Sequence, residues 1–511
     1  MKLQDHYDWI VFGSQPGALL SACLVARMGF SVLLLPMSLN QGLTVSRTGQ
    51  LFDPETNYLI GLGRSGEVDG LIRSCLVRVG IQPAEEAWIR TENCSPHILT
   101  SRNRLVFASN ELLPGEFHRE FGSNSVQALG LNLALHHMEL PYLKFWKDLP
   151  DRLTLSDLRK PIVAHAMTLK SLRKNALQKL GGTLGEAARG WVQSGQSISE
   201  FEENIGIPGL SQVFEGLWYS VTTGVRAEPS LPDLLHVLAL SRVGGSFKGG
   251  LTAYRLILIN LAKRLGVQVF PEVECRRFFV DRGKFSGVQL TQGGNMISAG
   301  GGILGFSFDR ISSRLTYTGR NWLRRTKKAA RPLGWKMTLA LTINEEAIPI
   351  GMSSRAVLKE KDAPVLELEV VEAADYANLV ARGKVLFLRT LMPFSLESLD
   401  VNYQQLIAAR MLRRATELFP FLDQHIRRIY PEFRSGMEDL GELYGFAALD
   451  LIPDQLIVYS GEGKGSASGI DGLFVASEES YPELGNLGPT VAGLESAAWL
   501  AHRSGLAGPF T

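Results

Sequence analysis

The sequence predicts an α/β fold with an additional α+β part, and three observations support this prediction. At the N-terminus, an apolar segment, a glycine-rich turn, a helical pattern and a second apolar segment follow one another, which is the order of a βαβ unit. A glycine-rich turn also precedes a helical pattern near the C-terminus, at 485–502. Between these ends, the segment 335–391 contains several candidate strands without intervening helical patterns, as in an antiparallel sheet.

The N-terminal unit begins with a buried strand over 7–12 and continues as a helix over 17–28. The helix is predicted from apolar residues at helical spacing, namely Leu19, Leu20, Cys23, Leu24 and Met28. Gly29 ends this helix. The second strand covers 31–35 and contains a continuous aliphatic run, which is typical of a parallel strand buried on both faces.

The middle of the chain continues with helix and strand patterns. We expect a helix over 251–265 and strands over 267–270, 278–280, 287–290 and 302–306. The turn Asp281-Arg282-Gly283-Lys284 separates two of these strands, so the pair is expected to form a hairpin.

The remaining elements suit a sheet that is covered by a helix. Strands are expected over 335–343, 365–371, 384–391 and 472–476, and helices over 403–418 and 489–502. The helix over 403–418 is amphipathic and stops near Pro420. In the first strand, alternate positions are apolar, so one face of it is expected to be buried; these positions are Met337, Leu339, Leu341 and Ile343.

Composition limits the classes of function. The 511 residues exceed what one simple hydrophobic core accommodates, so we expect two domains built from discontinuous segments. A formal net charge of +2 does not suggest a nucleic-acid-binding surface, so no nucleic-acid partner is expected. The cysteines are scattered without a C-x-x-C pair, which argues against zinc and disulfide frameworks. With no secretory leader and no apolar run of about 18 residues, the sequence predicts a cytoplasmic protein.

Four stretches of the sequence resemble one known family. They are "DWIVFGSQPGALLSACLVARMGFSVLLLP", "GGSFKGGLTAYRLILINLAKRLGVQVFPEVECRRFFVDRGKFSGVQL", "DGLFVASEESYPELGNLGPTVAGLESAAWLA" and, more weakly, "GQLFDPETNYLIGL". Their order and spacing are similar to those of the FAD-dependent phytoene desaturase and amine oxidase superfamily, whose members have an NAD(P)/FAD-binding Rossmann-type fold.

The resemblance implies a glutathione-reductase-like FAD-binding Rossmann domain with an inserted substrate domain of antiparallel sheet and helices. The Rossmann domain would consist of 1–75, 241–310 and 456–511. The substrate domain would consist of 76–240 and 311–455.

The same resemblance implies a set of FAD-binding residues in the first turn, namely Gly13, Ser14, Gln15, Gly17 and Ala18. The turn departs from the G-x-G-x-x-G/A fingerprint because Gln15 stands where the central glycine should be. A side chain there points toward the place of the pyrophosphate, and a positive φ would be costly without glycine.

Two further departures follow along the chain. Pro36 stands where the ribose-binding acid should close the second strand. Gln41-Gly42-Leu43 stands where the family often has Gly-Gly-Arg, and Arg47 is either a substitute for that arginine or an exposed side chain.

Later motifs complete the implied site. Cys275 stands where the family uses a valine whose backbone meets adenine. Glu478 or Glu479 would take the ribityl role, and the helix that begins at Gly488, Pro489 and Thr490 would direct its N–H groups at the flavin. FAD is therefore the expected cofactor, bound non-covalently, and no metal site is expected.

No catalytic residue is assigned, because desaturation of an apolar chain needs mainly hydride geometry and an apolar tunnel. The pair His136 and His137 is interpreted as ordinary helix histidines, since adjacent residues point to different faces. Several aromatic residues either line a cavity or fill the core: Tyr58, Trp218, Tyr219 and Phe247.

Two hypotheses about function remain open. The first is an FAD-dependent oxidoreductase acting on a hydrophobic, isoprenoid-like or acyl substrate. The second is a flavin-free pseudoenzyme of the same fold that serves as a scaffold or partner-binding subunit, in an oligomer or with another protein. The segment 131–149 is either a peripheral membrane contact, because it mixes aliphatic residues with Tyr142, Trp146 and lysines, or a core helix followed by a loop.

Overall fold

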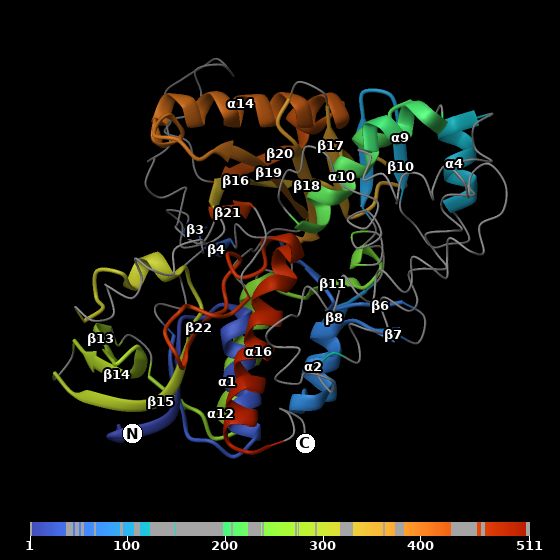
Figure 1. Cartoon of the computed structure of the whole chain (residues 1–511). Helices are drawn as coiled ribbons and strands as arrows, with labels where there is room; N and C mark the ends of the chain where they lie inside the picture. Colours follow the sequence, from blue (N-terminus) through green and yellow to red (C-terminus); the bar gives the residue numbers. More distant parts are fainter. Residues whose placement is uncertain are drawn as a thin grey trace.

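The computed structural model describes most of the chain. The described residues are 3–36, 44–45, 51–52, 56–65, 68–91, 96–106, 113–122, 198–205, 208–222, 240–270, 275–291, 294–316, 331–360, 363–373, 383–430, 457–460 and 465–506, with the single positions 149, 237 and 273. Two large sheets dominate them, and Figure 1 shows these sheets at opposite ends of the molecule.

The first sheet has seven strands and joins three distant parts of the sequence. β1 (His6–Phe12) runs parallel to β2 (Val32–Leu35) on one side and to β15 (Met296–Leu304) on the other. β12 (Gln268–Val269) extends the sheet beyond β2, and β22 (Leu473–Val475) pairs in parallel with the end of β15. The N-terminal and C-terminal segments therefore share one sheet, as the sequence predicts.

An antiparallel hairpin completes this sheet. β14 (Lys284–Leu290) pairs with the start of β15, and β13 (Cys275–Asp281) pairs with β14. The hairpin turns at Arg282 and Gly283, whose φ angles are 48° and 81°. Two consecutive positive φ angles are typical of the tight turns that suit the twist of paired strands.

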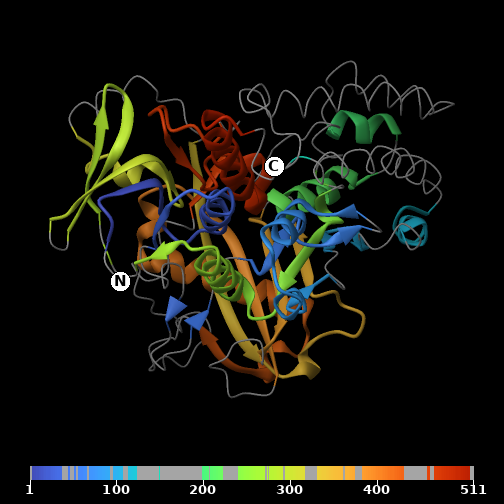
Figure 2. The same ribbon diagram turned by 90° about the horizontal axis from the view of Figure 1, so that it is seen from below.

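Three helices cover one face of the first sheet. They are α1 (Pro16–Arg27), α12 (Gly250–Arg264) and α16 (Gly488–Arg503). Figure 2 looks along α1 and shows it between α12 and α16, in agreement with its contacts to both helices. Trp9 and Val11 of β1 face this helical layer, whereas Ile10 and Phe12 belong to the core on the other face. Burial of both faces explains the uninterrupted apolar composition of the parallel strands.

The second sheet has eight strands and is mostly antiparallel. Its order is β10 (Arg104–Val106), β9 (His97–Thr100), β17 (Arg355–Lys359), β18 (Leu366–Glu372), β19 (Lys384–Pro393), β16 (Arg331–Ile343) and β20 (Ile426–Tyr430), with β21 (Ile457–Ser460) also on β16. α14 (Val401–Leu418) covers one face, and Asp400 caps its first turn by accepting from Asn402 N. The predicted apolar face of β16 packs in the core beneath this helix.

The other face of the second sheet meets two connecting elements. α10 (Leu210–Thr222) contacts β17 and β9. The three-stranded sheet of β5 (Tyr58–Ile60), β11 (Gly244–Phe247) and β8 (Ile89–Arg90) lies between the large sheets in Figure 1. The remaining short elements are β3 (Thr44–Val45), β4 (Leu51–Phe52), β6 (Arg64–Ser65), β7 (Val68–Asp69), α2 (Leu71–Val79), α3 (Pro83–Glu86), α4 (Leu113–Phe121), α9 (Ile198–Ile205), α15 (Leu422–His425) and the 3-10 turns Phe308–Ile311, Glu345–Ala347, Glu397–Leu399 and Pro482–Leu487.

The predicted elements are confirmed with shifted ends. β15 begins at Met296 rather than near 302, because its first half is the third strand of the hairpin meander. Between residues 3 and 506, no described helix is long and apolar enough to cross a membrane. His136, His137 and residues 131–148 of the segment 131–149 lie outside the described residues.

Candidate functional site

The turn between β1 and α1 has an unstrained backbone although Gln15 replaces the central glycine of the fingerprint. Gly13 has a φ of 93°, and its N–H donates to Leu35 O at 2.9 Å. Gln15, at the N-cap of α1, has φ −65° and ψ 141°, which any residue adopts. The strain expected from a non-glycine residue at this position is therefore absent, because the turn never needs a positive φ there.

Ala18 and Gly305 fix the distance between α1 and the end of β15. A Cβ atom on Gly305 would lie 2.9 Å from the Ala18 Cβ and 3.4 Å from the Gln15 Cβ. A larger side chain than alanine at position 18 would push the helix away from the strand. The third position of the fingerprint is thus small for the packing reason that the motif requires.

The first turns of α1 and α16 touch backbone to backbone. A Cβ atom on Gly17 would lie 1.9 Å from Pro489 O, and a Cβ on Gly493 would lie 2.2 Å from Gly17 O. Gly17 and Pro489 both stand at the start of their helices, so the two N-termini converge. Figure 1 shows these N-terminal ends directed toward the second sheet.

Both helices lack a side-chain cap among the described residues. The side chains of the N-cap residues Gln15 and Leu487 accept no cap hydrogen bond, but the Gly488 N–H at the start of α16 donates to Gly485 O of the preceding 3-10 turn. The N–H groups of a first helical turn have no partners within the helix, and together with the helix dipole they attract anions. Two such ends side by side bring the positive ends of two helix dipoles together.

One of the two predicted C-terminal acids, Glu479, makes hydrogen bonds within the protein. Glu479 accepts from Ser307 Oγ at 3.0 Å and from Phe308 N at 2.7 Å, so its carboxylate caps the 3-10 turn after β15. Glu478 is half-buried beside it. Thr490 is buried in the first turn of α16. The contacts assign Glu479 a structural role that the sequence does not reveal.

The predicted adenine and ribose positions are both buried. Cys275 is buried at the start of β13, and its carbonyl accepts from Arg314 Nη1 at 3.0 Å. Pro36 is buried directly after β2, at the predicted ribose position. Residues 41–43 and Arg47 lie outside the described residues. The close contacts bring Gly17 against Pro489 and Thr490, and Gln15 and Ala18 against Gly305. Cys275 belongs to the core that also contains Phe12 and Phe306.

A cleft of about 1040 Å³ lies beyond this edge, between β5, β8 and β11 on one side and the second sheet on the other. Its apolar wall includes Ile89, Phe247, Ile348, Ile350 and Met352. Its charged wall includes Arg90, Glu345, Glu346, Arg355, Glu369, Glu372 and Lys384. Tyr58 and Phe247 thus line a cavity, whereas Trp218 and Tyr219 are buried in the core.

Asn486 connects the cleft to the convergent helices. Its Oδ1 accepts from Ile60 N at 3.1 Å and its Nδ2 donates to Tyr58 O at 2.5 Å. Asn486 precedes Gly488 by two residues, so the turn that begins α16 is bound to the strand that carries Tyr58.

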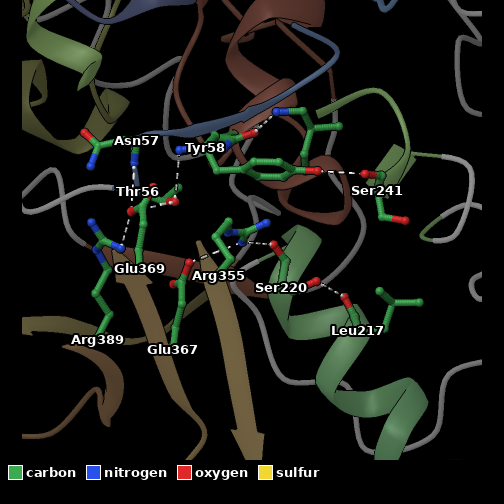
Figure 3. Close-up of polar contacts among 12 residues, drawn as sticks. Thr56, Asn57, Tyr58, Leu217, Ser220, Ser241, Arg355, Glu367, Glu369 and Arg389 are labelled. Carbon is green, nitrogen blue, oxygen red and sulfur yellow. Dashed lines mark hydrogen bonds and ion pairs between the residues drawn. The ribbon is translucent and has the colours of Figure 1, made fainter. Parts of the chain in front are cut away.

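A buried cluster of charges reaches the cleft at Arg355 and Glu369, and Figure 3 shows its polar contacts. Arg389 Nη1 donates to Glu369 Oε2 at 2.6 Å, and the same oxygen accepts from Asn57 N at 3.2 Å. Arg355 Nη2 donates to Ser220 O at 2.8 Å and to Glu367 Oε1 at 3.3 Å. These bonds join the second sheet to β5 and α10.

The charges in this cluster strongly influence one another. Lys336 Nζ lies 3.5 Å from Glu367 Oε2. Burial alone would raise the pKa of Glu367, but the cations of Lys336, Arg389 and Arg355 together lower it to about 2. Burial, with help from the Glu367 charge, raises the pKa of Tyr219 well above its usual range. Glu367 is therefore ionised and Tyr219 neutral at physiological pH.

No motif in the sequence marks this cluster. Its charged residues alternate with apolar ones along the strands, which is the pattern of a half-exposed strand. A usable signal is that Glu367 and Glu369 face the same side as Arg355 and Arg389 on neighbouring strands.

Comparison with known proteins defines the fold. No protein-family model matches the sequence, and no curated protein matches it. Among solved structures, the chain is similar to an oxidoreductase from Methanosarcina mazei, with a TM-score of 0.58, 14% identity and coverage of 95% of this chain and 98% of that one.

Two further structures have the same fold. The chain is similar to putrescine oxidase bound to putrescine, with a TM-score of 0.53, 12% identity and coverage of 98% and 99% of the two chains. It is equally similar to RAB GDI from Plasmodium falciparum, with a TM-score of 0.53, 10% identity and coverage of 99% of both chains.

The chain therefore has a mixed α/β architecture of the FAD-binding Rossmann-like kind. This confirms the predicted fold class at that level. At these identities the likeness concerns the fold alone.

Proposed function

We propose that this protein is an FAD-dependent oxidoreductase with a hydrophobic, isoprenoid-like or acyl substrate. The observation that carries the proposal is the backbone contact between Gly17 and Pro489, which brings two uncapped helix N-termini together. In this fold, a diphosphate and a flavin ring are the anionic and electron-rich groups that such ends accommodate.

The chain's residues have distinct parts in this proposal. The N–H groups of Ser14 and Gln15 would bind the diphosphate. In the first turn of α16, Pro489 has no N–H and the Gly488 N–H is bonded to Gly485 O, so the Thr490 N–H would orient the flavin ring. Asn486 would hold that turn against β5. When bound, FAD supplies the hydride acceptor, so the protein needs only to position an apolar substrate and exclude water.

The residues present suit the diphosphate of FAD well and its ribose poorly. Gln15 adopts an unstrained backbone, and Ala18 is small enough for the helix to approach β15. Pro36 offers no carboxylate for ribose hydroxyls, and Glu479 is already bonded to Ser307 and Phe308. We therefore expect non-covalent FAD binding that is weaker than a complete fingerprint would give.

The apolar side of the cleft supports the hydrophobic substrate. Ile348, Ile350 and Met352 lie on one wall, and Ile89 and Phe247 lie on the other. We propose that the second sheet and α10 form the predicted substrate domain, because their inner face closes this cleft.

The absorbance spectrum of the purified protein tests the proposal, followed by equilibrium dialysis against FAD. We expect a flavin absorption band that co-purifies with the protein, or saturable binding of one FAD per chain. Absence of both in the folded protein would reject the oxidoreductase.

The alternative is a flavin-free member of the fold that serves as a scaffold or partner-binding subunit. It is favoured by the buried Pro36 at the ribose position and by the use of Glu479 as a cap. A folded protein that takes up no FAD and elutes as a complex or oligomer would support it.

A further inference from the structure

We propose that the cleft binds a monocarboxylate with an apolar body and that Arg355 recognises its carboxylate. Such a monocarboxylate would be the substrate of the proposed oxidoreductase. Its binding does not depend on that proposed function, whereas its oxidation does. Arg355 is on β17, lines the cleft and is 3% exposed.

The first argument is the charge of the buried cluster. It contains the cations Lys336, Arg355 and Arg389 and the anions Glu367 and Glu369, all at most 5% exposed. Within it, Arg355 and Lys336 share the carboxylate of Glu367, which leaves one positive charge in excess among these three described side chains. A buried uncompensated charge is costly, so a singly charged anion is the expected complement.

The second argument is the bonding of Arg355 itself. Its Nη2 donates two hydrogen bonds, to Ser220 O and to Glu367 Oε1. Its Nε and Nη1 are buried and have no hydrogen-bond partner among the residues that the structure describes. A guanidinium carries five N–H donors, and buried donors are nearly always satisfied by protein, water or a ligand. An acceptor with charge, such as a carboxylate, forms the stronger bond here.

Tyr58 controls access to these donors. Its ring lies 3.8 Å from the Arg355 guanidinium carbon and lines the cleft. Its hydroxyl donates to Ser241 O at 2.8 Å, which holds the ring in place. Because Nε and Nη1 are shielded from solvent, the ring has to move aside when the carboxylate reaches Arg355.

The charges of the cleft disfavour a ligand that carries more than one negative charge. Four glutamates and three bases line it, so its wall has a net charge of −1. Lys384 bonds Glu372 and lies 3.4 Å from Glu345, whereas no ion pair of Glu346 is among the described contacts. A phosphate ester or nucleotide carries more charge than the single excess cation compensates. The apolar wall requires that the rest of the ligand be hydrophobic.

The test uses the full-length protein and octanoate as the probe, with octanamide and octyl phosphate as matched ligands. Isothermal titration calorimetry should give saturable octanoate binding, at least about tenfold tighter than octanamide or octyl phosphate, as loss of one charge-assisted bond implies. Arg355→Lys should lower the affinity for octanoate by at least about tenfold and leave the affinity for octanamide unchanged. Lys359→Gln, on the same strand but paired with Glu215 outside the cleft lining, should leave octanoate affinity unchanged.

Tyr58→Phe provides a second variant that keeps both the ring and the arginine. Loss of the Ser241 hydrogen bond should speed octanoate association in stopped-flow measurements. Equal affinity for octanoate and octanamide, or an Arg355→Lys variant that melts as a folded protein and binds octanoate normally, would overturn the inference. Arg355→Lys is uninformative if it does not fold. In that case the inference is overturned if Tyr58→Phe associates with octanoate at the wild-type rate and wild type binds octanoate and octanamide with equal affinity.

Each titration is repeated with and without FAD, so that the two proposals can fail separately. Octanoate binding without any FAD uptake would refute the oxidoreductase and keep the carboxylate site. FAD uptake without octanoate binding would refute the carboxylate site and keep the oxidoreductase.

Discussion

The side-chain amide of Asn486 donates a 2.5 Å hydrogen bond to the backbone carbonyl of Tyr58. The same side chain accepts from Ile60 N at 3.1 Å, so it replaces a neighbouring strand along that edge of β5. Asn486 precedes the first turn of α16, while Tyr58 covers Arg355 in the cleft. One amide therefore connects the proposed flavin-binding turn with the proposed carboxylate site.

Replacing Asn486 should loosen this connection. Asn486→Ala leaves the Ile60 N–H and the Tyr58 carbonyl without their partner, which we expect to lower the free energy of unfolding by about 1–3 kcal/mol. Urea denaturation measures this change. Asn402→Ala, at an exposed position of α14, is the control and should stay within about 0.5 kcal/mol of wild type. Equal stabilities of the two variants would contradict the role of Asn486.

The contact between α1 and α16 should be intolerant of any side chain at Gly17. A Cβ there would lie 1.9 Å from Pro489 O, which is rigid backbone. Gly17→Ala is therefore expected to destabilise the protein by more than about 3 kcal/mol, measured by thermal or urea unfolding. Gly115→Ala is the matched control, because nothing lies within 4 Å of a Cβ at that α4 position. It should stabilise by about 0.5–1 kcal/mol, and a neutral Gly17→Ala would refute the close approach.

Glu495 of α16 should make stability fall as pH rises. Burial raises the pKa of Glu495 to about 7, in spite of the hydrogen bond that its Oε2 accepts from Ser466 N at 3.0 Å. Because the folded pKa is above the unfolded value of 4.5, the stabilising protonated form is fully present below pH 4.5 and is lost as pH rises through about 7. At 1.36 kcal/mol per unit, this difference corresponds to roughly 3 kcal/mol.

Glu495→Gln removes this titration and keeps the shape of the side chain. Urea unfolding across pH 4.5–8 should show wild type losing stability relative to the variant as pH increases. Parallel pH profiles of the two proteins would contradict the raised pKa.

The Arg389–Glu369 pair should be sensitive to loss of either charge. Its atoms are 2.6 Å apart, and the side chains are 0% and 4% exposed. Glu369→Gln should cost about 3–5 kcal/mol in unfolding experiments, because it removes the buried carboxylate that Arg389 bonds and keeps the buried cation. Asp471→Asn breaks a 3.9 Å pair with Arg503 at 53% and 40% exposure, so it should change stability by less than about 1 kcal/mol. Similar costs for both variants would argue against the buried cluster.

Local periodicity accounts for what the sequence predicts well. The aliphatic run before Pro36 and the alternation of Met337, Leu339, Leu341 and Ile343 each reflect burial on a regular backbone. Such patterns identify elements and faces, and the order of the motifs then identifies the fold.

The parts that the sequence misses depend on tertiary contacts. Glu367 and Glu369 alternate with Leu366 and Leu368, as on a solvent-facing strand, but β5 and α10 cover them. Gln15 departs from the fingerprint in residue type, but its backbone is unstrained, which only the φ and ψ angles reveal. Glu479 matches an acidic motif position, yet its carboxylate caps the turn at Ser307 and Phe308.

The central claim is that the convergent N-termini of α1 and α16 hold FAD, and the most direct measurement is the melting temperature with and without FAD. Wild type and Gln15→Gly are compared. We predict that FAD raises the melting temperature of both, with a stabilisation of about 2.7 kcal/mol at a concentration 100 times Kd. Without FAD, Gln15→Gly should melt lower, because glycine adds freedom to a turn that Gln15 occupies without strain. No FAD-dependent shift in either folded protein would contradict the claim and leave the flavin-free scaffold.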